Sequence, residues 1–345
     1  MPDGPLTSRQ VVLARYIHGL PTPEDFRIET VELAPLEPGE LRVRTLYASV
    51  DPGTLTRLGG HASYAPALLP GEIIVSATVG EVVDSRNELF SPGELVGGSW
   101  GLRDTAVVGA RGLRKVEPGP EPVSAELGVF GIPGLTAYFG ILELGKLRSG
   151  DTVLVSSAAG AVGSVAGQVA RLHGARVVGI AGGRAECQWL EELGFDAVID
   201  HRAETDLAGV IRKLCPEGVG VFLDNVGGAV LDAALPNMAP RGRVVLSGLV
   251  ADFGVPVEQR PALRNTAYLF THRLRMEGFV LFDYAVRFAE ARLELRRWVQ
   301  EGKLRYREHV VEGLEAAPAA FAGLFRGENF GRMLVHMGEG GRPRA

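Results

Sequence analysis

The sequence predicts an α/β protein in which a β-rich first part is followed by a doubly wound parallel sheet. Between residues 26 and 122, short apolar runs are separated by Pro-Gly and similar turns, as in antiparallel strands. From about Ala125 onward, helical periodicity appears, and strands then alternate with helices, as in a parallel sheet with helical crossovers. A chain of 345 residues also exceeds the usual size of one hydrophobic core, so we expect two domains.

The individual elements follow from this pattern. In the first part, we expect strands at Leu41–Arg44, Ile73–Val75, Ala77–Val79, Glu94–Val96 and Ala106–Val108. In the second part, we expect strands at Val153–Val155, Arg176–Ile180, Ala197–Ile199, Val219–Leu223, Gly242–Leu246 and Arg275–Leu281. The expected helices there are Val162–His173, Glu186–Leu193, Ala203–Leu214 and Tyr284–Glu301. The last apolar runs would return the chain to the first domain, which gives domains of 1–125 with 305–345, and 126–304.

Composition excludes several classes of protein. Hydrophobic residues make up 46% of the chain, charged residues 22%, and the net charge is -5, so nothing favours a nucleic-acid partner. The two cysteines, Cys187 and Cys215, argue against a disulfide-stapled secreted domain. No stretch resembles a signal peptide or a membrane span, so we expect a cytoplasmic protein with no membrane partner.

A zinc site is not expected. Zinc in proteins is held by clustered cysteine and histidine ligands. The predicted first domain contains no cysteine before Ala125, and its histidines, His18 and His61, are not spaced as a ligand set. We therefore expect no metal ion.

The most informative segment is a small-residue turn between the strand at Val153–Val155 and the next helix. It resembles the dinucleotide-binding fingerprint, with Ala158 in place of the first glycine and Gly160 and Gly163 as the second and third. Gly160 would let the backbone approach a pyrophosphate, and Gly163 would allow close packing of helix on strand, while the helix N-terminus attracts the anion. Taken alone, the motif also fits a simple tight turn.

The end of the following strand bears on which dinucleotide binds. A site that prefers NAD places an acidic residue about 20 residues beyond the fingerprint, on the ribose hydroxyls. No carboxylate is present between Gly179 and Arg184. Arg184, next to Gly183, would instead meet a 2′-phosphate, helped by His201 or Arg202. The sequence therefore favours NADP, with NADPH as the reduced form, and leaves NADH open.

Four motifs carry a family resemblance that extends from about Phe26 to Val335. They are Gly134–Gly140 (GLTAYFG), Ala158–Gly167 (AAGAVGSVAG), Asp224–Gly228 (DNVGG) and Glu328–Gly331 (ENFG). These motifs resemble those of the zinc-free medium-chain dehydrogenase/reductase family that contains leukotriene B4 dehydrogenase/prostaglandin reductase, bacterial curcumin reductase and plant alkenal double-bond reductase. The resemblance implies a GroES-like β-barrel domain and a Rossmann domain, an active cleft between them, and a homodimer.

The resemblance also assigns residues to the cofactor. The pyrophosphate would lie at Ala161–Ser164 and the ribose beside Asn225. Ser247–Leu249, after the fifth strand, would border the nicotinamide side, and Phe279–Leu281 with Asn329 would fix the nicotinamide ring. With the residues inferred above, the expected cofactor-binding set is Gly160, Ala161, Val162, Gly163, Ser164, Gly183, Arg184, His201, Arg202, Asn225, Ser247, Gly248, Leu249, Phe279, Val280, Leu281 and Asn329. The alternative for both asparagines is a loop residue that satisfies its own turn.

The activity that the resemblance implies is NADPH-dependent reduction of the activated C=C bond of a small enal or enone. Hydride would reach the β-carbon, and the resulting enolate would then take up a proton. Two alternatives stay open, which are an NAD(P)H quinone reductase and a non-catalytic nicotinamide-nucleotide-binding protein.

This chain departs from the family at positions that bear on function. The family commonly has Lys at Glu186 and Tyr at His201, so two usual contacts to the 2′-phosphate are absent. The family's Asp-Pro-Tyr is Asp-Pro-Gly here, and its tyrosine after the fifth strand is a phenylalanine. The proton donor is therefore unassigned, and the candidate pocket residues are Asp51, Gly53, Tyr64, Phe253 and Tyr268.

Overall fold

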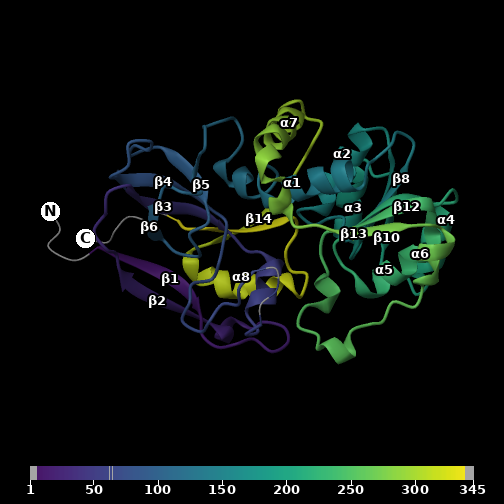
Figure 1. Cartoon of the computed structure of the whole chain (residues 1–345), viewed down its shortest axis with the longest axis horizontal. Helices are drawn as coiled ribbons and strands as arrows, with labels where there is room; N and C mark the ends of the chain where they lie inside the picture. Colours follow the sequence, from purple (N-terminus) through teal and green to yellow (C-terminus); the bar gives the residue numbers. More distant parts are fainter. Residues whose placement is uncertain (1–5, 62, 64, 339–345) are drawn as a thin grey trace. The chain divides into compact units, whose positions relative to one another are not determined.

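The computed structural model describes residues 6–61, 63 and 65–338 (Figure 1). Contacts divide the chain into two compact units. The discontinuous unit comprises the residues up to Leu127 and those from Glu308 onward, and the continuous unit is Gly128–Arg307. The predicted α/β fold class is confirmed, because an antiparallel β sheet dominates the first unit and a parallel sheet the second.

The discontinuous unit contains two sheets. Strands β1 and β2 form an antiparallel pair, and the larger sheet has the order β14-β15-β3-β4-β5-β7, with β6 also paired to β3. The strands and helix of the discontinuous unit are β1 Thr7–Leu13, β2 Phe26–Glu32, β3 Glu40–Ser49, β4 Thr78–Ser85, β5 Leu95–Gly98, β6 Thr105–Gly109, β7 Arg114–Lys115, β14 Glu308–Glu312, α8 Ala317–Leu324 and β15 Arg332–His336.

Alternation along β3 explains why this segment is a central strand. Leu41 and Val43 are fully buried and pack against Val82, Val96 and other residues of the same core cluster. The intervening residues are more exposed, which is the period-2 pattern of a strand with one face in the core.

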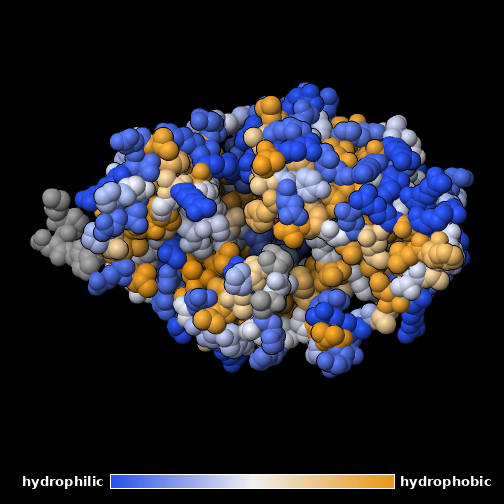
Figure 2. Space-filling view, in the orientation of Figure 1, coloured by the Kyte–Doolittle hydropathy of each residue, from blue (hydrophilic) through white to orange (hydrophobic). Residues whose placement is uncertain are grey.

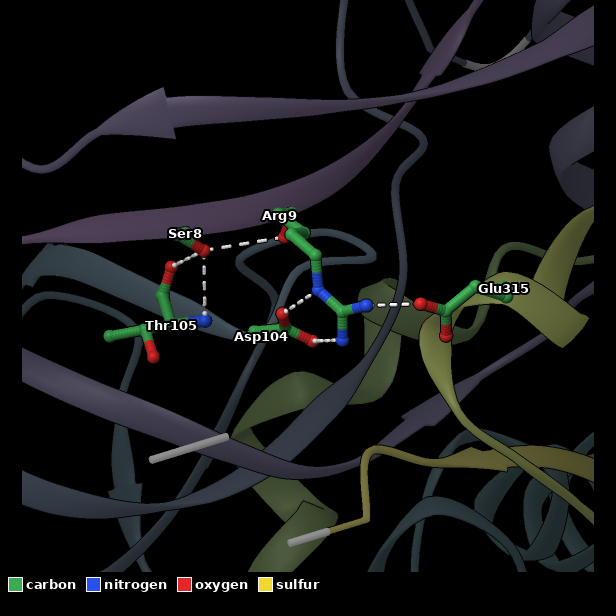
Figure 3. A network of polar contacts seen from close by, with 5 residues as sticks. All are labelled: Ser8, Arg9, Asp104, Thr105 and Glu315. Atoms are coloured by element: carbon green, nitrogen blue, oxygen red, sulfur yellow. Dashed lines mark hydrogen bonds and ion pairs between the residues drawn. The ribbon is translucent and has the colours of Figure 1, made fainter. Parts of the chain in front are cut away.

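A polar network joins β1 to the rest of the unit (Figure 3). The Ser8 hydroxyl donates to the Thr105 carbonyl at 2.7 Å and accepts from the Thr105 N–H at 3.0 Å. The Arg9 guanidinium donates to the buried Asp104 carboxylate at 2.7 Å and also pairs with Glu315. These contacts connect a strand that shares no ladder with the larger sheet.

The strand predicted at Ile73–Val75 is wrong. Ile73 forms only an isolated bridge with Val12. The Ile74 N–H donates to the Val11 carbonyl at 2.9 Å, and the Ile74 carbonyl accepts from the Leu102 N–H at 3.0 Å. Among the described residues, this segment therefore makes only isolated backbone contacts and forms no strand ladder. The next strand, β4, begins at Thr78, which leaves Ala77 outside it.

The continuous unit is a six-stranded parallel sheet in the order β10-β9-β8-β11-β12-β13. The order reverses between β8 and β11, which makes the carboxyl ends of these two strands the topological switch point. Its elements are α1 Ile132–Phe139, β8 Thr152–Val155, α2 Gly163–Leu172, β9 Arg176–Ala181, α3 Arg184–Glu192, β10 Ala197–Asp200, α4 Leu207–Leu214, β11 Val219–Asp224, α5 Gly228–Ala234, β12 Met238–Leu246, α6 Ala267–Thr271, β13 Arg275–Gly278 and α7 Phe288–Gln300.

Several predicted boundaries in this unit are wrong. The strand expected from Gly242 begins at Met238, and the helix expected from Tyr284 begins at Phe288, because Leu281–Arg287 form a 3-10 helix. The strand expected to reach Leu281 ends at Gly278, because its neighbour β12 ends at Leu246, the residue paired with Gly278. The helix expected from Ala203 begins at Leu207, because the Asp206 side chain caps it by accepting from the Gly209 N–H at 2.9 Å. In the described part of the chain, no helix is long and apolar enough to span a membrane.

Close packing of α2 depends on one glycine. A Cβ atom at Gly167 would lie 2.0 Å from Cζ of Phe195, a side chain that is itself buried. The helix therefore approaches the phenyl ring more closely than any side chain at this position permits.

We predict that Gly167→Ala lowers the free energy of unfolding by about 1–3 kcal/mol, because overpacking outweighs the gain in helix propensity. Urea denaturation measures the effect. Adding Phe195→Leu to the same chain should restore part of the loss, since leucine lacks the ring atoms involved. Additive effects of the two substitutions would contradict this account. Gly109→Ala, with no atom within 4 Å of the added Cβ, is the control.

Candidate functional site

The switch point of the parallel sheet is organised around a buried carboxylate. Asp224, at the end of β11, has no exposed surface. It accepts from the Ser156 hydroxyl at 2.6 Å and from the N–H groups of Val226 and Gly227, each at 3.0 Å. Burial raises the pKa of the Asp224 carboxyl, and these hydrogen bonds partly offset it. The network joins the ends of β8 and β11.

Asn225, predicted to lie by the ribose, is held at the same place. Its N–H donates to the Ser156 hydroxyl at 2.8 Å, and its Nδ2 donates to the Ser156 carbonyl at 2.7 Å. One function of the side chain is therefore structural, because it joins the turns that follow β8 and β11. The position at the switch point also agrees with the predicted neighbourhood of a dinucleotide.

The turn between β8 and α2 has the geometry of an anion-binding loop. Ser157 adopts a positive φ of 47°, and the Gly160 N–H donates to its carbonyl at 3.1 Å. A Cβ atom at Gly163 would lie 2.4 Å from the Ser157 oxygen, so this position requires glycine. The Ser164 hydroxyl donates to the Gly160 carbonyl at 2.8 Å. In the first turn of α2, the Ser164 N–H donates to the Gly160 carbonyl at 3.0 Å and the Ala166 N–H to the Val162 carbonyl at 2.9 Å. The N–H groups of Ala161, Val162 and Gly163 therefore come at the N-terminal end of the helix, where an anion would bind.

Basic side chains from two segments, the loop after β10 and the start of α3, come near the end of β9. A Cβ atom at Gly182 would lie 2.9 Å from Arg202 Nε and 3.0 Å from His201 Nε2, so both side chains lie over this glycine. Gly183 precedes α3 with a φ of 95°, and Arg184 is exposed in the first turn of that helix. His201 and Arg202 thus lie over Gly182, and Arg184 begins the helix that follows, while their role at a 2′-phosphate stays a prediction.

Two carboxylates also reach this point, which the sequence argument did not foresee. Glu186 accepts from the Gly182 N–H at 2.8 Å, and Asp200 accepts from the Gly183 N–H at 2.9 Å. The end of β9 itself lacks an acid, as expected. The acids come from the first turn of α3 and from the end of β10.

The segment after β12 packs on the switch point. The N–H groups of Ser247 and Gly248 both donate to the Asp224 carbonyl, at 2.8 and 3.2 Å. Leu249 is exposed and lies against Gly227, where a Cβ atom would be 2.8 Å from its Cδ2. All three predicted residues therefore border the ends of β11 and β12.

The other predicted nicotinamide residues of this unit follow β13 and have different surroundings. Leu281 is buried and Val280 is exposed. The Phe279 ring lies edge-on to Tyr284, with 6.2 Å between centroids. Tyr284 in turn stacks on Phe139, at 4.8 Å, so its ring packs within an aromatic cluster.

Among the candidate pocket residues of this unit, Tyr268 has a structural position. It packs against the hydrophobic core cluster beneath the sheet and against the His272 ring, with 5.1 Å between centroids. Phe253 is half-buried and ends the short 3-10 helix Val250–Asp252. Tyr64 lies outside the described residues.

In the discontinuous unit, Asp51 is bound from two sides. Its carboxylate accepts from the Arg332 guanidinium and from the Ser49 hydroxyl, both at 2.5 Å. Burial alone would raise the pKa of Asp51, but the charge of Arg332 and the two hydrogen bonds hold it below its ordinary value. Asp51 is therefore ionised at neutral pH and oriented by its partners. Gly53 lies in the 3-10 helix that follows and accepts from the Thr56 hydroxyl at 2.8 Å.

Asn329 satisfies its own turn. Its Nδ2 donates to the Gly331 carbonyl at 3.0 Å, just before β15 begins. This contact agrees with the alternative given for this residue, a loop asparagine, and leaves its predicted role at the nicotinamide a prediction.

Comparison with known proteins identifies the chain. Residues 9–116 match the family model described as the N-terminal domain of oxidoreductase, and residues 161–296 match that of zinc-binding dehydrogenase. The NADPH-dependent curcumin reductase of Escherichia coli strain K12 is 38% identical, over 96% of this chain and 97% of the relative. The chain belongs to the medium-chain dehydrogenase/reductase family.

Other relatives place it within that family. Prostaglandin reductase 1 of Bos taurus is 38% identical over 94% of this chain and 97% of the relative. The crystal structure of CurA from Vibrio vulnificus in complex with NADPH has a TM-score of 0.90 and 39% identity, covering 96% of this chain and 99% of that one. The recognition of a curcumin reductase and prostaglandin reductase relative from its motifs is confirmed.

One of the two matched family models is described as zinc-binding. Across the residues that the structure describes, no group of three or more His, Cys, Asp or Glu side chains is arranged to hold a metal ion. The expectation that this medium-chain reductase uses no zinc stays a prediction.

Sequence reasoning missed the polar cluster around Arg332. This side chain is buried and donates from Nε to the Leu127 carbonyl at 2.9 Å. In the sheet, Arg332 is paired with Glu308, whose carboxylate accepts from the Ser124 hydroxyl at 2.7 Å. The second oxygen of Glu308 is buried and makes no hydrogen bond within the described residues. No sequence motif predicts this cluster, because its residues are far apart in the sequence.

Burial raises the pKa of Glu308, and the Ser124 hydroxyl and the charge of Arg332 only partly offset this effect. The folded protein therefore binds more protons than the unfolded chain at pH values between the ordinary value of 4.5 and the raised pKa. The contribution of Glu308 to the free energy of unfolding is fully present below pH 4.5. It is lost as the pH rises from 4.5 through the raised pKa.

We predict that Glu308→Gln removes this pH dependence, because the amide does not titrate. The free energy of unfolding of the parent chain should fall relative to that of the variant as the pH rises above 4.5. Urea denaturation at a series of pH values measures both curves. Parallel curves would show that Glu308 has an ordinary pKa in the folded protein.

Proposed function

We propose that this chain is an NADPH-dependent reductase of the activated C=C bond of a small enal or enone. The observation that carries the proposal is the near full-length match to an NADPH-dependent curcumin reductase and to a relative of known structure in complex with NADPH. The chain's own geometry supports it, because a glycine-requiring turn and a helix N-terminus meet at the switch point of a parallel sheet.

The residues present fit a nicotinamide dinucleotide. Gly163 leaves no room for a Cβ atom beside the turn, and the adjacent N–H groups at the start of α2 suit a pyrophosphate. The charged groups over Gly182 suit the adenosine ribose and its 2′-phosphate. We assign cofactor binding to Gly160, Ala161, Val162, Gly163, Ser164, Gly183, Arg184, His201, Arg202, Asn225, Ser247, Gly248, Leu249, Phe279, Val280, Leu281 and Asn329.

When bound, NADPH supplies the hydride that reduces the β-carbon of the substrate. The chain's part is to orient the substrate and to stabilise the enolate oxygen that results. Asp51 is a poor proton source, because Arg332 and Ser49 keep its carboxyl ionised. We infer that Asp51 positions the start of the 3-10 helix Pro52–Arg57 and is not the proton donor. We propose that the substrate domain, expected at residues 1–125 and 305–345, is the discontinuous unit, which ends at Leu127 and resumes at Glu308.

We predict that NADPH carrying deuterium at the transferred position labels the β-carbon of an enone product. Loss of nicotinamide absorbance gives the rate, and mass spectrometry with NMR gives the site of the label. Label at the carbonyl carbon would overturn the proposed reaction. Oxidation of NADPH by quinones but by no enal or enone would favour a quinone reductase, and binding without turnover would favour a non-catalytic nucleotide-binding protein.

We also propose a homodimer. Within the described residues, β13 pairs only with β12 and so forms an edge of the parallel sheet. Large apolar side chains are exposed on the same unit, with 85% exposure at Phe270 and 95% at Val286. Figure 2 shows hydrophobic residues among hydrophilic ones over α6 and α7. These surfaces suit a self-association face. The two free cysteines fit the proposed cytoplasmic location.

Analytical ultracentrifugation should give twice the mass of the chain. We predict that Phe270→Arg, which places a charge on the proposed face, shifts the protein toward the monomer. Leu89→Arg, at a residue that is 71% exposed on the discontinuous unit, is the control and should leave the dimer intact. A monomeric parent chain at micromolar concentration would overturn the proposed dimer without affecting the proposed reaction.

A further inference from the structure

The end of β9 carries two backbone N–H groups that are already occupied by carboxylates. Gly182 donates to Glu186 at 2.8 Å, and Gly183 donates to Asp200 at 2.9 Å. In a doubly wound sheet, the end of the second strand meets the adenosine ribose of a bound dinucleotide. Since β9 follows β8 in the chain and lies beside it in the sheet, the ribose of a nicotinamide dinucleotide would lie at these two glycines.

The two carboxylates differ in how firmly they are held. Asp200 accepts from the N–H groups of both Gly183 and Arg202, at 2.9 and 3.0 Å, and so forms part of the loop. These bonds lower the pKa of Asp200. Within the residues that the structure describes, Glu186 makes a single hydrogen bond, to Gly182, from a longer side chain in the first turn of α3. Glu186 is therefore the carboxylate that can be displaced.

A ribose 2′-hydroxyl and a 2′-phosphate require different partners at Gly182 and Gly183. The hydroxyl is a donor to a carboxylate, which is why an acid here favours NAD. The phosphate is an anion that needs cations and N–H donors, and a neighbouring carboxylate repels it. Arg202 and His201 lie over Gly182 and provide cationic or donor groups, whereas Glu186 occupies the Gly182 N–H itself.

We propose that Glu186 is a specificity-determining residue that narrows the preference for NADPH over NADH. The inference rests on the proposed function, because it concerns the cofactor site of that reductase. With NADH, the Glu186 carboxylate stays in place and accepts from the ribose 2′-hydroxyl. With NADPH, the carboxylate leaves the Gly182 N–H, and the phosphate takes over that donor together with Arg202. The chain therefore uses both cofactors, and the negative charge of Glu186 weakens the binding of NADPH.

The substitution Glu186→Gln tests the charge alone, since the amide oxygen can still accept from Gly182. We predict that it tightens NADPH binding on the order of tenfold, as expected for removing one like charge near the protein surface, and leaves NADH within about twofold. Glu186→Lys should raise the ratio of the two affinities further. Isothermal titration calorimetry measures the dissociation constants without any turnover.

Two fragments isolate the subsite from the rest of the cofactor. The dissociation constant of 2′,5′-ADP should fall in Glu186→Gln, while that of 5′-AMP should not change. High salt should shrink the difference, because the effect is electrostatic. Glu191→Gln is the matched control, since it removes the same charge from an exposed position on the same helix.

The outcomes separate this inference from the proposed function. A change confined to ligands with the 2′-phosphate, and to Glu186 variants, supports the role of Glu186. Equal effects of Glu186→Gln and Glu191→Gln, or an unchanged ratio of NADPH to NADH affinity, would overturn it while the reductase stands. Absence of binding by either dinucleotide would overturn both, and normal binding without enone turnover would overturn the reaction alone.

Discussion

The hydrogen bond between Ser156 and Asp224 is the interaction on which the switch point of the parallel sheet depends. It links the two strands between which the order of the parallel sheet reverses. A carboxylate with no exposed surface is costly unless it is fully hydrogen-bonded, so Asp224 constrains every donor around it. Those donors are the hydroxyl after β8 and the N–H groups after β11, while its carbonyl receives the segment after β12. Three loops are thereby fixed by one residue.

This arrangement explains why a site without an acid–base pair is chemically sufficient. The hydride chemistry belongs to the cofactor, so the protein contributes position and an electrostatic environment. The turns at Gly163 and Gly182 leave little room for a side chain, and within the discontinuous unit Arg332 and Ser49 orient the Asp51 carboxylate. Asp224 is thus used to build loops, and the lowered pKa of Asp51 keeps that carboxylate ionised.

The sequence predicted the parts of this molecule that depend on local patterns. Apolar runs located most strands, and the small-residue turn located the loop before α2, because both follow from short-range sterics. Contacts between segments that are far apart in the sequence could not be predicted from local patterns. Glu186 and Asp200 converge on two glycines from different elements, and Arg332 meets Leu127 and Glu308 from far along the chain. The end of β13 was misplaced because it is set by the length of β12.

The discontinuous unit is interrupted in a way that orders its assembly. On one edge of β3, β6 covers Glu40–Arg44, whereas Tyr47–Ser49 pair with β15. During synthesis, the whole of Gly128–Arg307 emerges before β15 does, so the continuous unit can fold while that stretch of edge still has open backbone groups. A nascent chain that ends before β15 therefore has an incomplete sheet in the discontinuous unit. Because synthesis proceeds from the N-terminus, β15, which pairs with Tyr47–Ser49 of β3, is the last strand of the discontinuous unit to be made.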